Sequence, residues 1–550
     1  MLLNRFLEKI KFDSYEDFKN NYRLKPIDDF NFGFDVVDAW ANAEPEKMAL
    51  VWTNDYNETK EFSFSDISSY SNKCANYLES LGISIGDRVL LILKQRPEVW
   101  FTFTALHKMG AVCIPATYQL TKKDIIYRCN AAKVKAIICV DDNEVVNNIL
   151  DALDECETVE NVIVCGNNVQ CGMIDYRKEY EKCSSIYERK EFSPKNPMLI
   201  YFSSGTTGMP KMIMHDFFFP LGHIVTAKYW QQVEENKLHL TMSDSGWAKF
   251  AWGKIYGQWI CGATILAYDN EKFNAKNTLD TLVKFQVCTF CAPPTIFRFL
   301  IKEDLSEYDL SFIKHAAIAG EPLNPEVWRK FKEITGLSLT EGFGQTETPV
   351  LLANFPWIDI KPGSTGKPSP LYDIDIVDDN GNTCEDGVVG RIVIKNLSKF
   401  YPKGLIREYV DAPEANKKAF YNDCYDTGDT AWRDSDGYYW FEGRSDDVIK
   451  CSGYRIGPFE VESALMTHPS VLECAVTAAP DPIRGQVVKA TIVLAKGYEA
   501  SEELKKELQI HVKKVTAPYK YPRIVDFVSE LPKTTSGKIK RSDIRKKEEQ

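Results

Sequence analysis

Short apolar runs alternate with helix-length amphipathic segments through most of this chain of 550 residues. The runs at 89–93, 136–140, 162–165 and 198–202 contain no charged or strongly polar residue. Strands with this composition are buried on both faces, as in the parallel sheets of α/β proteins. We therefore predict an α/β fold for the first two thirds of the chain.

The pattern changes near residue 371. Short strand-like segments follow, joined by turns such as Asp379-Asn380-Gly381 and Asp436-Gly437. These turns predict a β-rich subdomain over about 371–445. The remaining residues, 446–550, contain another set of short helices and strands and are expected to form a separate small domain. The boundary is predicted within Gly443-Arg-Ser-Asp-Asp447.

The charge balance excludes some partners. The chain has 67 basic and 78 acidic residues, a net charge of −11. We expect no nucleic-acid partner, because a general nucleic-acid binder is basic. The longest apolar-looking stretch, 255–268, is too short to cross a bilayer and contains Gln258, so we also expect no membrane span.

Cysteine usage and the first residues guide the expected location. The 15 cysteines are scattered, and the close pair Cys288 and Cys291 has no second pair to complete a zinc site. Buried thiols are the favoured interpretation, which fits a reducing compartment. The first twenty residues mix acids and bases without a long apolar stretch, unlike a secretion signal or a transit peptide. We expect a cytoplasmic protein.

The sharpest local feature is Tyr201-Phe-Ser-Ser-Gly-Thr-Thr-Gly-Met-Pro-Lys211, which follows an apolar run. Glycines let backbone N–H groups approach an anion, hydroxyls donate hydrogen bonds and lysine supplies charge. A polar surface turn is the alternative interpretation. The segment is not a Walker loop, because the Gly-Lys-Ser/Thr ending is absent. The candidate phosphate-binding residues are Ser203, Ser204, Gly205, Thr206, Thr207, Gly208 and Lys211.

Four further motifs follow in order: Gly342-Phe-Gly-Gln-Thr-Glu347, Tyr425-Asp-Thr-Gly-Asp429, Gly443-Arg-Ser-Asp-Asp-Val-Ile-Lys450 with Ser452-Gly-Tyr-Arg455, and Pro532-Lys-Thr-Thr-Ser-Gly-Lys538. Together with the phosphate loop they resemble the adenylate-forming superfamily of acyl-CoA synthetases, peptide-synthetase adenylation domains and luciferases. The resemblance covers about residues 34–545. It is strongest to medium-chain acyl-CoA synthetases, on Ser452–Pro458, Pro480–Gly485 and Thr516–Arg523.

This resemblance implies an acid–thiol ligase that uses ATP, Mg²⁺ and CoA. The acid would first form an acyl-adenylate with release of pyrophosphate, and CoA would then displace AMP. The implied architecture is a large N-terminal domain, 1–445, made of two α/β subdomains and a distorted β-barrel, followed by a small mobile α+β domain, 446–550. The implied partners are a small carboxylic acid, ATP and CoA, and the oligomeric state is left open.

The resemblance also assigns roles to individual residues of the nucleotide site. Lys538 would bridge the acid and the α-phosphate. Glu347 would bind Mg²⁺, for which carboxylate oxygen is a suitable ligand, and Thr346 and Gln345 would donate to phosphate. The alternative is a capping box at a helix start, with Thr346 or Thr348 near the start and Glu347 as the acid. Asp429 would accept both ribose hydroxyls, with a turn aspartate as the alternative.

Further roles concern adenine, the hinge and CoA. Phe343, next to Gly342, and the segment Gly320-Glu321-Pro322 would lie beside adenine. Arg444 would contact the ribose and Arg455 a phosphate. Asp446 would be the hinge on which the small domain turns between its two arrangements. Gly453 would leave room for the pantetheine arm of CoA, and Lys513 would bind its phosphates unless it lies on a solvated helix face.

The acid pocket is predicted from one small residue and three large ones. Acetyl-specific relatives carry a tryptophan before the Gln-Thr-Glu triplet, where this chain has Gly344. We therefore expect an acid larger than acetate, either a medium-chain fatty acid or a short branched acid. Trp247, Lys249 and Trp252 occupy the region that lines the pocket, with core packing as the alternative for the indoles. Lys249 either points to solvent or shortens the pocket.

Two other functions remain open at this point. The chain could adenylate an acid and transfer it to a carrier protein, or it could be a silent regulator that binds nucleotide or acyl groups. The intact Lys538, Glu347 and Asp429 disfavour the silent regulator, and the Gly453 region disfavours the carrier protein.

Overall fold

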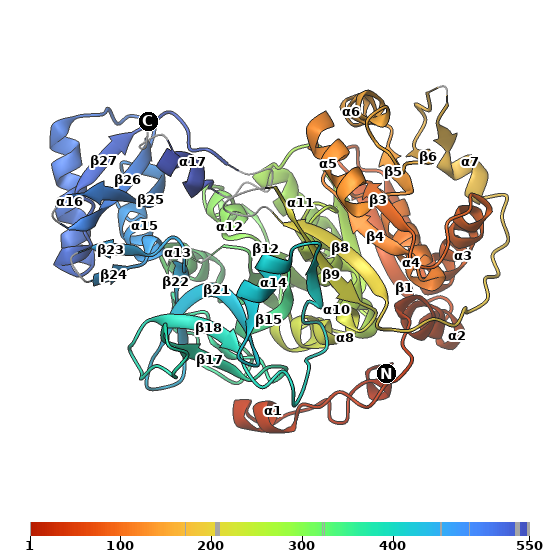
Figure 1. Ribbon diagram of the computed structural model, residues 1–550, viewed down its shortest axis with the longest axis horizontal. Helices are drawn as coiled ribbons and strands as arrows, with labels where there is room; N and C mark the ends of the chain where they lie inside the picture. Colours follow the sequence, from red (N-terminus) through yellow and green to blue (C-terminus); the bar gives the residue numbers. More distant parts are fainter. Residues whose placement is uncertain are drawn as a thin grey trace.

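The structure is a computed structural model that describes residues 2–170, 172–203, 209–321, 323, 325–451, 454–482, 484–533 and 539–546. The side chains of residues 450, 454, 455 and 546 are outside this description. Within the described residues the strands form four sheets, and Figure 1 shows the C-terminal one (blue) beside the other three.

The first α/β sheet has eight strands in the order β19-β9-β8-β4-β3-β5-β6-β7. Its centre is parallel, while β9 and β19 pair antiparallel at one edge. The strands are β3 (Arg88–Ile92), β4 (Val112–Pro115), β5 (Ala136–Val140), β6 (Asn161–Cys165), β7 (Ile174–Asp175), β8 (Pro197–Ser203), β9 (Lys211–Asp216) and β19 (Glu408–Val410). The four apolar runs singled out in the sequence are β3, β5, β6 and β8, which confirms that prediction.

Helices connect and cover this sheet. They are α3 (Phe64–Ser80), α4 (Glu98–Met109), α5 (Lys122–Ala132), α6 (Asn143–Leu153) and α7 (Tyr176–Tyr180). Local sequence sets their ends: α3 and α5 both begin with a capping box, at Ser63 and Thr121, and α4 ends at Gly110 in the left-handed region. The segment before the sheet contains η1 (Leu2–Arg5), α1 (Tyr15–Asn21), η2 (Gly33–Asp38) and α2 (Ala39–Ala43).

The second α/β sheet has nine strands in the order β16-β15-β14-β13-β12-β10-β11-β1-β2. Its strands are β1 (Met48–Asn54), β2 (Thr59–Ser63), β10 (Leu238–Thr241), β11 (Thr264–Asp269), β12 (Thr289–Ala292), β13 (His315–Ile318), β14 (Leu339–Gln345), β15 (Thr348–Ala353) and β16 (Lys367–Pro368). The accompanying helices are α8 (Phe219–Ile224), η3 (Val225–Trp230), α9 (Ala248–Lys254), α10 (Tyr256–Ile260), α11 (Ala275–Phe285), α12 (Pro294–Leu300), η4 (Leu305–Glu307) and α13 (Pro325–Thr335).

The third sheet is antiparallel and lies in the region predicted to be β-rich. It contains β17 (Ile374–Val377), β18 (Gly390–Ile394), β20 (Phe420–Tyr421), β21 (Cys424–Arg433) and β22 (Tyr439–Arg444), with α14 (Pro413–Ala419) beside it. β21 is the central strand, and its register places Asp429 opposite Arg444 of β22.

The fourth sheet follows Arg444. It contains β23 (Ile449–Cys451), β24 (Tyr454–Ile456), β25 (Val471–Asp481), β26 (Gly485–Leu494) and β27 (Ile524–Phe527), with α15 (Pro458–Met466), α16 (Glu502–Val515), η5 (Pro518–Lys520) and α17 (Arg541–Lys546). Its apolar side chains form a core cluster of their own, in which no residue before Ile449 takes part. The architecture is a large N-terminal part of mixed helices and sheets with a small C-terminal domain, as predicted.

Two sequence interpretations can be compared directly with these elements. Cys288 and Cys291 are both buried at β12 and take the place of small core side chains. The capping box proposed for Thr346 and Glu347 is wrong, because these residues form the turn between β14 and β15 and no helix begins there. Among the helices that the structure describes, none is long and apolar enough to cross a membrane.

Candidate active site

The motif residues of β14 and β21 meet although 80 residues separate them in the chain. The side-chain amide of Gln345 donates to the carbonyl oxygen of Thr427 at 2.8 Å and to the Asp429 carboxylate. Its amide oxygen accepts from the hydroxyl of Tyr425 at 3.0 Å. The amide thus has partners on both sides, which fixes its orientation.

Asp429 is held from a second side by Arg444 of the neighbouring strand. The guanidinium lies 3.4 Å from one carboxylate oxygen of Asp429 and 3.8 Å from the carboxylate of Asp446. Gly428 leaves room for it, because a Cβ there would stand 2.7 Å from the guanidinium and its φ is +70°. Asp429 is only 5 % exposed and lies inside β21, so the interpretation as a turn aspartate is wrong.

Glu347 lies in the tight turn between β14 and β15. Its carboxylate accepts from the hydroxyl of Tyr409 on β19 at 2.9 Å, and its carbonyl oxygen accepts from the N–H of Ile406 at 2.8 Å. Removal from water raises the pKa of Glu347, while the Tyr409 hydrogen bond and the charges of Arg444 and Lys211 oppose that rise. The side chain is therefore held by β19 next to two cationic residues.

Lys211 begins β9 at the end of the predicted phosphate loop. Its ammonium lies 5.1 Å from the ring centroid of Tyr409, the same tyrosine that binds Glu347. In the register of the β8–β9 hairpin, Lys211 is opposite Ser203. The two ends of the predicted phosphate loop are therefore paired with each other. Lys211 and Glu347 both lie next to Tyr409.

Aromatic side chains flank the glycines of β14. The ring of Phe343 lies 5.7 Å from that of Phe441 on β22. Gly342 packs directly on Trp230, because a Cβ at this position would stand 2.3 Å from a carbon of the indole ring. Only glycine allows this approach.

The segment predicted beside adenine directly follows β13. Gly320 has a φ of +106°, and Glu321 accepts from the Thr295 hydroxyl at 3.0 Å. Lys249 reaches this segment from α9: its ammonium donates to the carbonyl oxygen of Ala319 and would lie 2.9 Å from a Cβ on Gly320. Lys249 therefore points into the site, and the interpretation in which it points to solvent is wrong.

The acid-pocket candidates surround the same place. Trp247 precedes the first residue of α9, and Trp252 lies on that helix with its ring 5.8 Å from the ring of Trp230. Gly344 is exposed, but a Cβ there would stand 2.8 Å from the carbonyl oxygen of Pro349 on β15. The backbone of the neighbouring strand is therefore one reason for a glycine at 344.

Several predicted residues lie outside the described residues. They are Ser204, Gly205, Thr206, Thr207, Gly208, Pro322, Gly453 and Lys538. The backbone of Arg455 lies in β24, and its side chain is outside the description. Lys513 is in the last turn of α16, where its ammonium lies 3.9 Å from the ring centroid of Tyr521. No described contact joins Lys513 to the nucleotide motifs.

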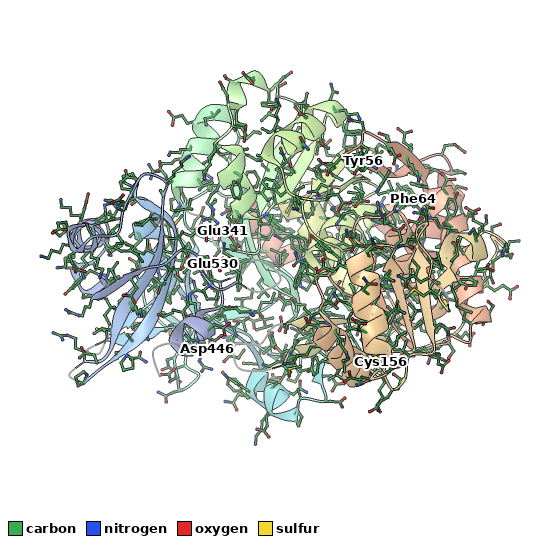
Figure 2. The ribbon with its side chains drawn as sticks, turned by 90° about the horizontal axis from the view of Figure 1, so that it is seen from above. Tyr56, Phe64, Cys156, Glu341, Asp446 and Glu530 are labelled. Carbon is green, nitrogen blue, oxygen red and sulfur yellow. The ribbon has the colours of Figure 1, made fainter. Side chains whose placement is uncertain are left out.

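The structure adds a residue that the sequence analysis missed. Glu341 directly precedes Gly342, is 5 % exposed and accepts from the backbone N–H of Leu323 at 3.4 Å. Burial raises the pKa of Glu341 to about 8. Figure 2 shows Glu341 and Asp446 in the region where the C-terminal part meets the rest of the molecule. A carboxylate within the buried first half of a strand, directly before the motif glycine, was the available signal.

A magnesium ion fits this site only in part. Glu347 offers the hard carboxylate oxygen that Mg²⁺ prefers, and Lys211 and Arg444 show that the surroundings suit polyphosphate. Among the described residues, no group of three or more His, Cys, Asp or Glu side chains is placed to hold a metal. An ion bound here would need most of its ligands from phosphate oxygens and water.

Comparison with known families agrees with these motifs. The model of the AMP-binding enzyme family matches residues 37–401, and the model of the AMP-binding enzyme C-terminal domain matches residues 460–538. The chain belongs to the AMP-binding enzyme family.

Named relatives cover nearly the whole chain. It is 43 % identical over 547 residues to the Mus musculus acyl-coenzyme A synthetase ACSM3, mitochondrial, covering 98 % of this chain and 94 % of the relative. It is 42 % identical over 528 residues to the Homo sapiens acyl-coenzyme A synthetase ACSM4, mitochondrial, covering 94 % and 90 %. These matches show that the chain is an AMP-forming acid–thiol ligase that makes acyl-CoA through an adenylate.

Solved structures agree with the fold. The anthranilate CoA ligase AuaEII in complex with anthranoyl-AMP matches with a TM-score of 0.87 and 29 % identity, covering 95 % of this chain and 98 % of the other. A benzoate CoA ligase from Burkholderia xenovorans LB400 matches with a TM-score of 0.82 and 25 % identity, covering 94 % and 100 %.

The predicted cytoplasmic location is contradicted by the comparison, because the relatives are named mitochondrial. Scattered free cysteines indicate a reducing compartment, but they do not distinguish one reducing compartment from another. Cysteine usage therefore does not identify the compartment.

Proposed function

We propose that this chain activates a carboxylic acid larger than acetate, either a short branched acid or a medium-chain fatty acid, and joins it to CoA. The observation that carries the proposal is the hydrogen-bonded connection of Gln345, Asp429 and Arg444, with Glu347 and Lys211 beside it. Such an arrangement offers acceptors for a ribose and cations for phosphates in one place.

Asp429 is proposed to accept the ribose hydroxyls. Its two oxygens already have partners in Gln345 and Arg444, which orient the carboxylate. Arg444 would add a contact to the ribose, Phe343 and Gly342 would lie against adenine, and Gly320, Glu321 and Pro322 would form the edge beside it. Glu341 would face adenine as a neutral acid at pH 7, because its pKa is about 8.

The phosphates are proposed to bind between the loop at 203–211 and the turn at Glu347. Thr346 and Gln345 would donate to phosphate, Lys211 would supply charge, and Glu347 would be the protein ligand of Mg²⁺. The metal would neutralise charge on the phosphates. Donors and cations that are already in place reduce the reorganisation that the transition state requires.

The C-terminal domain is proposed to contribute different residues to the two half-reactions. We place the boundary at 445/446, with Asp446 as hinge, because the separate apolar core begins at Ile449. Lys538 would stabilise the developing charge at the α-phosphate during adenylation. The face with Gly453 would admit the pantetheine arm of CoA, Arg455 would bind phosphate, and Lys513 would bind the CoA phosphates.

The pocket for the acid is proposed between Trp230, Trp252, Lys249 and Gly344, with Trp247 at its entrance. The two indole rings lie 5.8 Å apart, and the ammonium of Lys249 occupies space next to Gly320. These bulky groups favour a short or branched chain over a long straight one. An apolar pocket separates neighbouring chain lengths only weakly, so we expect a broad optimum.

The names of the relatives support a mitochondrial location for this chain, and detection of the endogenous protein in purified mitochondria would test it. The same relatives are CoA enzymes, which disfavours transfer to a carrier protein. A silent regulator is disfavoured by the intact connection of Gln345, Asp429 and Arg444.

The experiment that tests the proposal is ATP–pyrophosphate exchange without CoA, measured with acids from acetate to decanoate and with branched and aromatic acids. We expect exchange that depends on the acid, with an optimum above acetate. Addition of CoA should then release AMP and acyl-CoA. Best exchange with acetate would contradict the proposed pocket, and absence of exchange with every acid would contradict the proposed function.

A further inference from the structure

The two ends of the phosphate loop are held by one helix that carries none of the family motifs. β8 ends at Ser203 and β9 begins at Lys211, and these two residues are opposite each other in the hairpin. Contacts to the residues just before Ser203 and just before Lys211 therefore act on the two described ends of the loop.

At the end of the loop, the contact is a hydrogen bond from α5. The hydroxyl of Tyr127 donates to the carbonyl oxygen of Pro210 at 2.8 Å. Proline has no N–H, so Pro210 cannot extend the hairpin ladder beyond Lys211. The bond from Tyr127 instead holds the residue that directly precedes this lysine.

At the start of the loop, the contact is a stack on Phe202. The guanidinium of Arg128 lies 5.2 Å from the ring centroid of Phe202, and the ring of Tyr127 meets the same phenyl ring edge-on with centroids 6.0 Å apart. Phe202 directly precedes Ser203. Two consecutive residues of one helix thus contact both ends of the loop.

The helix is itself firmly anchored. α5 begins with the capping box of Thr121 and Asp124, and Asp124 lies 3.6 Å from Arg128 one turn later. Its buried face, with Ile125 and Cys129, packs in one apolar cluster with Phe202 and Met212 of β8 and β9. The Arg128 side chain is 11 % exposed, so its guanidinium has little freedom.

We propose that Tyr127 and Arg128 are positioning residues for the polyphosphate of ATP: they clamp the paired ends of the phosphate loop, Ser203 and Lys211, against α5 and so set where these two residues stand. The inference rests on the proposed function. It predicts that variants of these residues bind ATP more weakly. The second half-reaction should be unaffected, because the acyl-adenylate carries no β- or γ-phosphate.

The test compares Tyr127→Phe with wild type. This change removes only the hydroxyl and keeps the ring against Phe202. Loss of one neutral hydrogen bond corresponds to about a 3–10-fold rise in the KM for ATP in pyrophosphate exchange and in the Kd for ATP measured by calorimetry without acid. The rate of thioester formation from synthetic acyl-adenylate and CoA should be unchanged.

Three more variants separate clamping from a general loss of structure. Arg128→Lys keeps the charge but loses the planar group that stacks on Phe202, and should raise the KM for ATP less than Arg128→Gln does. Tyr70→Phe is the matched control, since Tyr70 is a half-buried tyrosine on α3 whose ring stacks on Phe101. It should behave as wild type in both half-reactions.

An unchanged KM and Kd for ATP in Tyr127→Phe would overturn the clamp. Equal losses in exchange and in thioester formation would also overturn it, because that is the signature of a general structural role. A wild-type protein that binds ATP but exchanges pyrophosphate with no acid would contradict the proposed function instead, and the Kd comparison would still decide the clamp.

Discussion

The nucleotide site and the C-terminal domain are built differently. In the nucleotide site each central side chain has partners from other strands: Gln345 of β14 is bonded to β21, Asp429 of β21 faces Arg444 of β22, and Glu347 is bonded to Tyr409 of β19. These bonds fix the groups before any ligand arrives, which is the condition for electrostatic preorganisation.

In the described part of the chain, groups near the proposed hinge, Asp446, join the C-terminal domain to this region. Phe459 lies 6.4 Å from Phe441, and Glu460 of α15 faces Glu442 of β22 with Lys520 beside it. Its apolar core is separate. A domain that rotates requires few contacts with its neighbour, close to the point where the chain passes from one domain to the other. Under the proposed function, one region would bind in both half-reactions and the other would change its contribution between them.

The largest expected effect comes from Lys538→Ala. Removal of a central cation should lower acid-dependent pyrophosphate exchange by about 10³-fold or more. Thioester formation from supplied acyl-adenylate should change little, because the lysine is proposed to act only during adenylation. Lys540→Ala, at a half-exposed lysine two residues away, is the control. Equal loss of both half-reactions would remove the distinction between the two regions.

Asp429→Ala, unlike Lys538→Ala, should slow both half-reactions. The AMP part of the ligand is present in both half-reactions, so loss of its ribose acceptor should lower both by about 10²-fold. Asp429→Asn, which keeps one acceptor oxygen, should lose less. The two half-reaction rates measured on the same preparations provide the check. A loss of adenylation alone would indicate that Asp429 acts in only one half-reaction, as proposed for Lys538.

The contact across the hinge should depend on pH through Glu442. Burial, together with the charge of Glu460, raises the pKa of Glu442 from 4.5 to about 7. In the unfolded chain the carboxyl loses its proton near pH 4.5, so from there to pH 7 unfolding releases a proton and stability falls as pH rises. Above pH 7 this contribution is constant.

Glu442→Gln should remove this dependence while keeping an acceptor for the indole N–H of Trp432, which donates to Glu442 at 3.0 Å. The melting temperature of the variant, relative to wild type, should rise by about 1–3 °C between about pH 5 and pH 7 and then stay level. A constant difference across this range would show that Glu442 does not titrate at the domain contact.

The smallest effect is expected in the acid pocket. Trp252→Leu removes one of the two neighbouring indoles, so relative kcat/KM should shift toward acids one or two carbons longer, by about 10-fold. The comparison is made across one acid series in the exchange assay. Gly344→Trp is less informative, because any side chain at 344 must displace the backbone at Pro349. An unchanged profile in Trp252→Leu would remove this residue from the pocket.

The sequence was most informative where pattern and chemistry are local. Apolar runs predicted β3, β5, β6 and β8, and the ordered motifs contain the residues that meet around Asp429. It was silent where a partner comes from an unmarked segment: Tyr409 has no motif around it, yet the pairing of β19 with β9 brings it to Glu347. Tyr127 also has no motif around it, and only the fold shows that it contacts Pro210.

Two interpretations were made without knowledge of the β14–β15 hairpin: the alternative of a capping box at Thr346 and Glu347, which is wrong, and the open space at Gly344, which stays a prediction. The turn at Thr346 looked like a helix start, because a hydroxyl followed by an acid suits a capping box as well as it suits a hairpin turn. Gly344 was interpreted only as empty space, since a strand pair that needs a glycine for backbone clearance cannot be seen without its register.

The most direct test of two successive half-reactions on one site is a single-turnover measurement. Enzyme in excess is mixed with labelled ATP, Mg²⁺ and the preferred acid, and CoA is added later. The account predicts about one equivalent of pyrophosphate per ATP consumed before CoA is added, with the acyl-adenylate retained on the protein, and free AMP only after CoA. Pyrophosphate that appears only after CoA, or free AMP before it, would contradict the account.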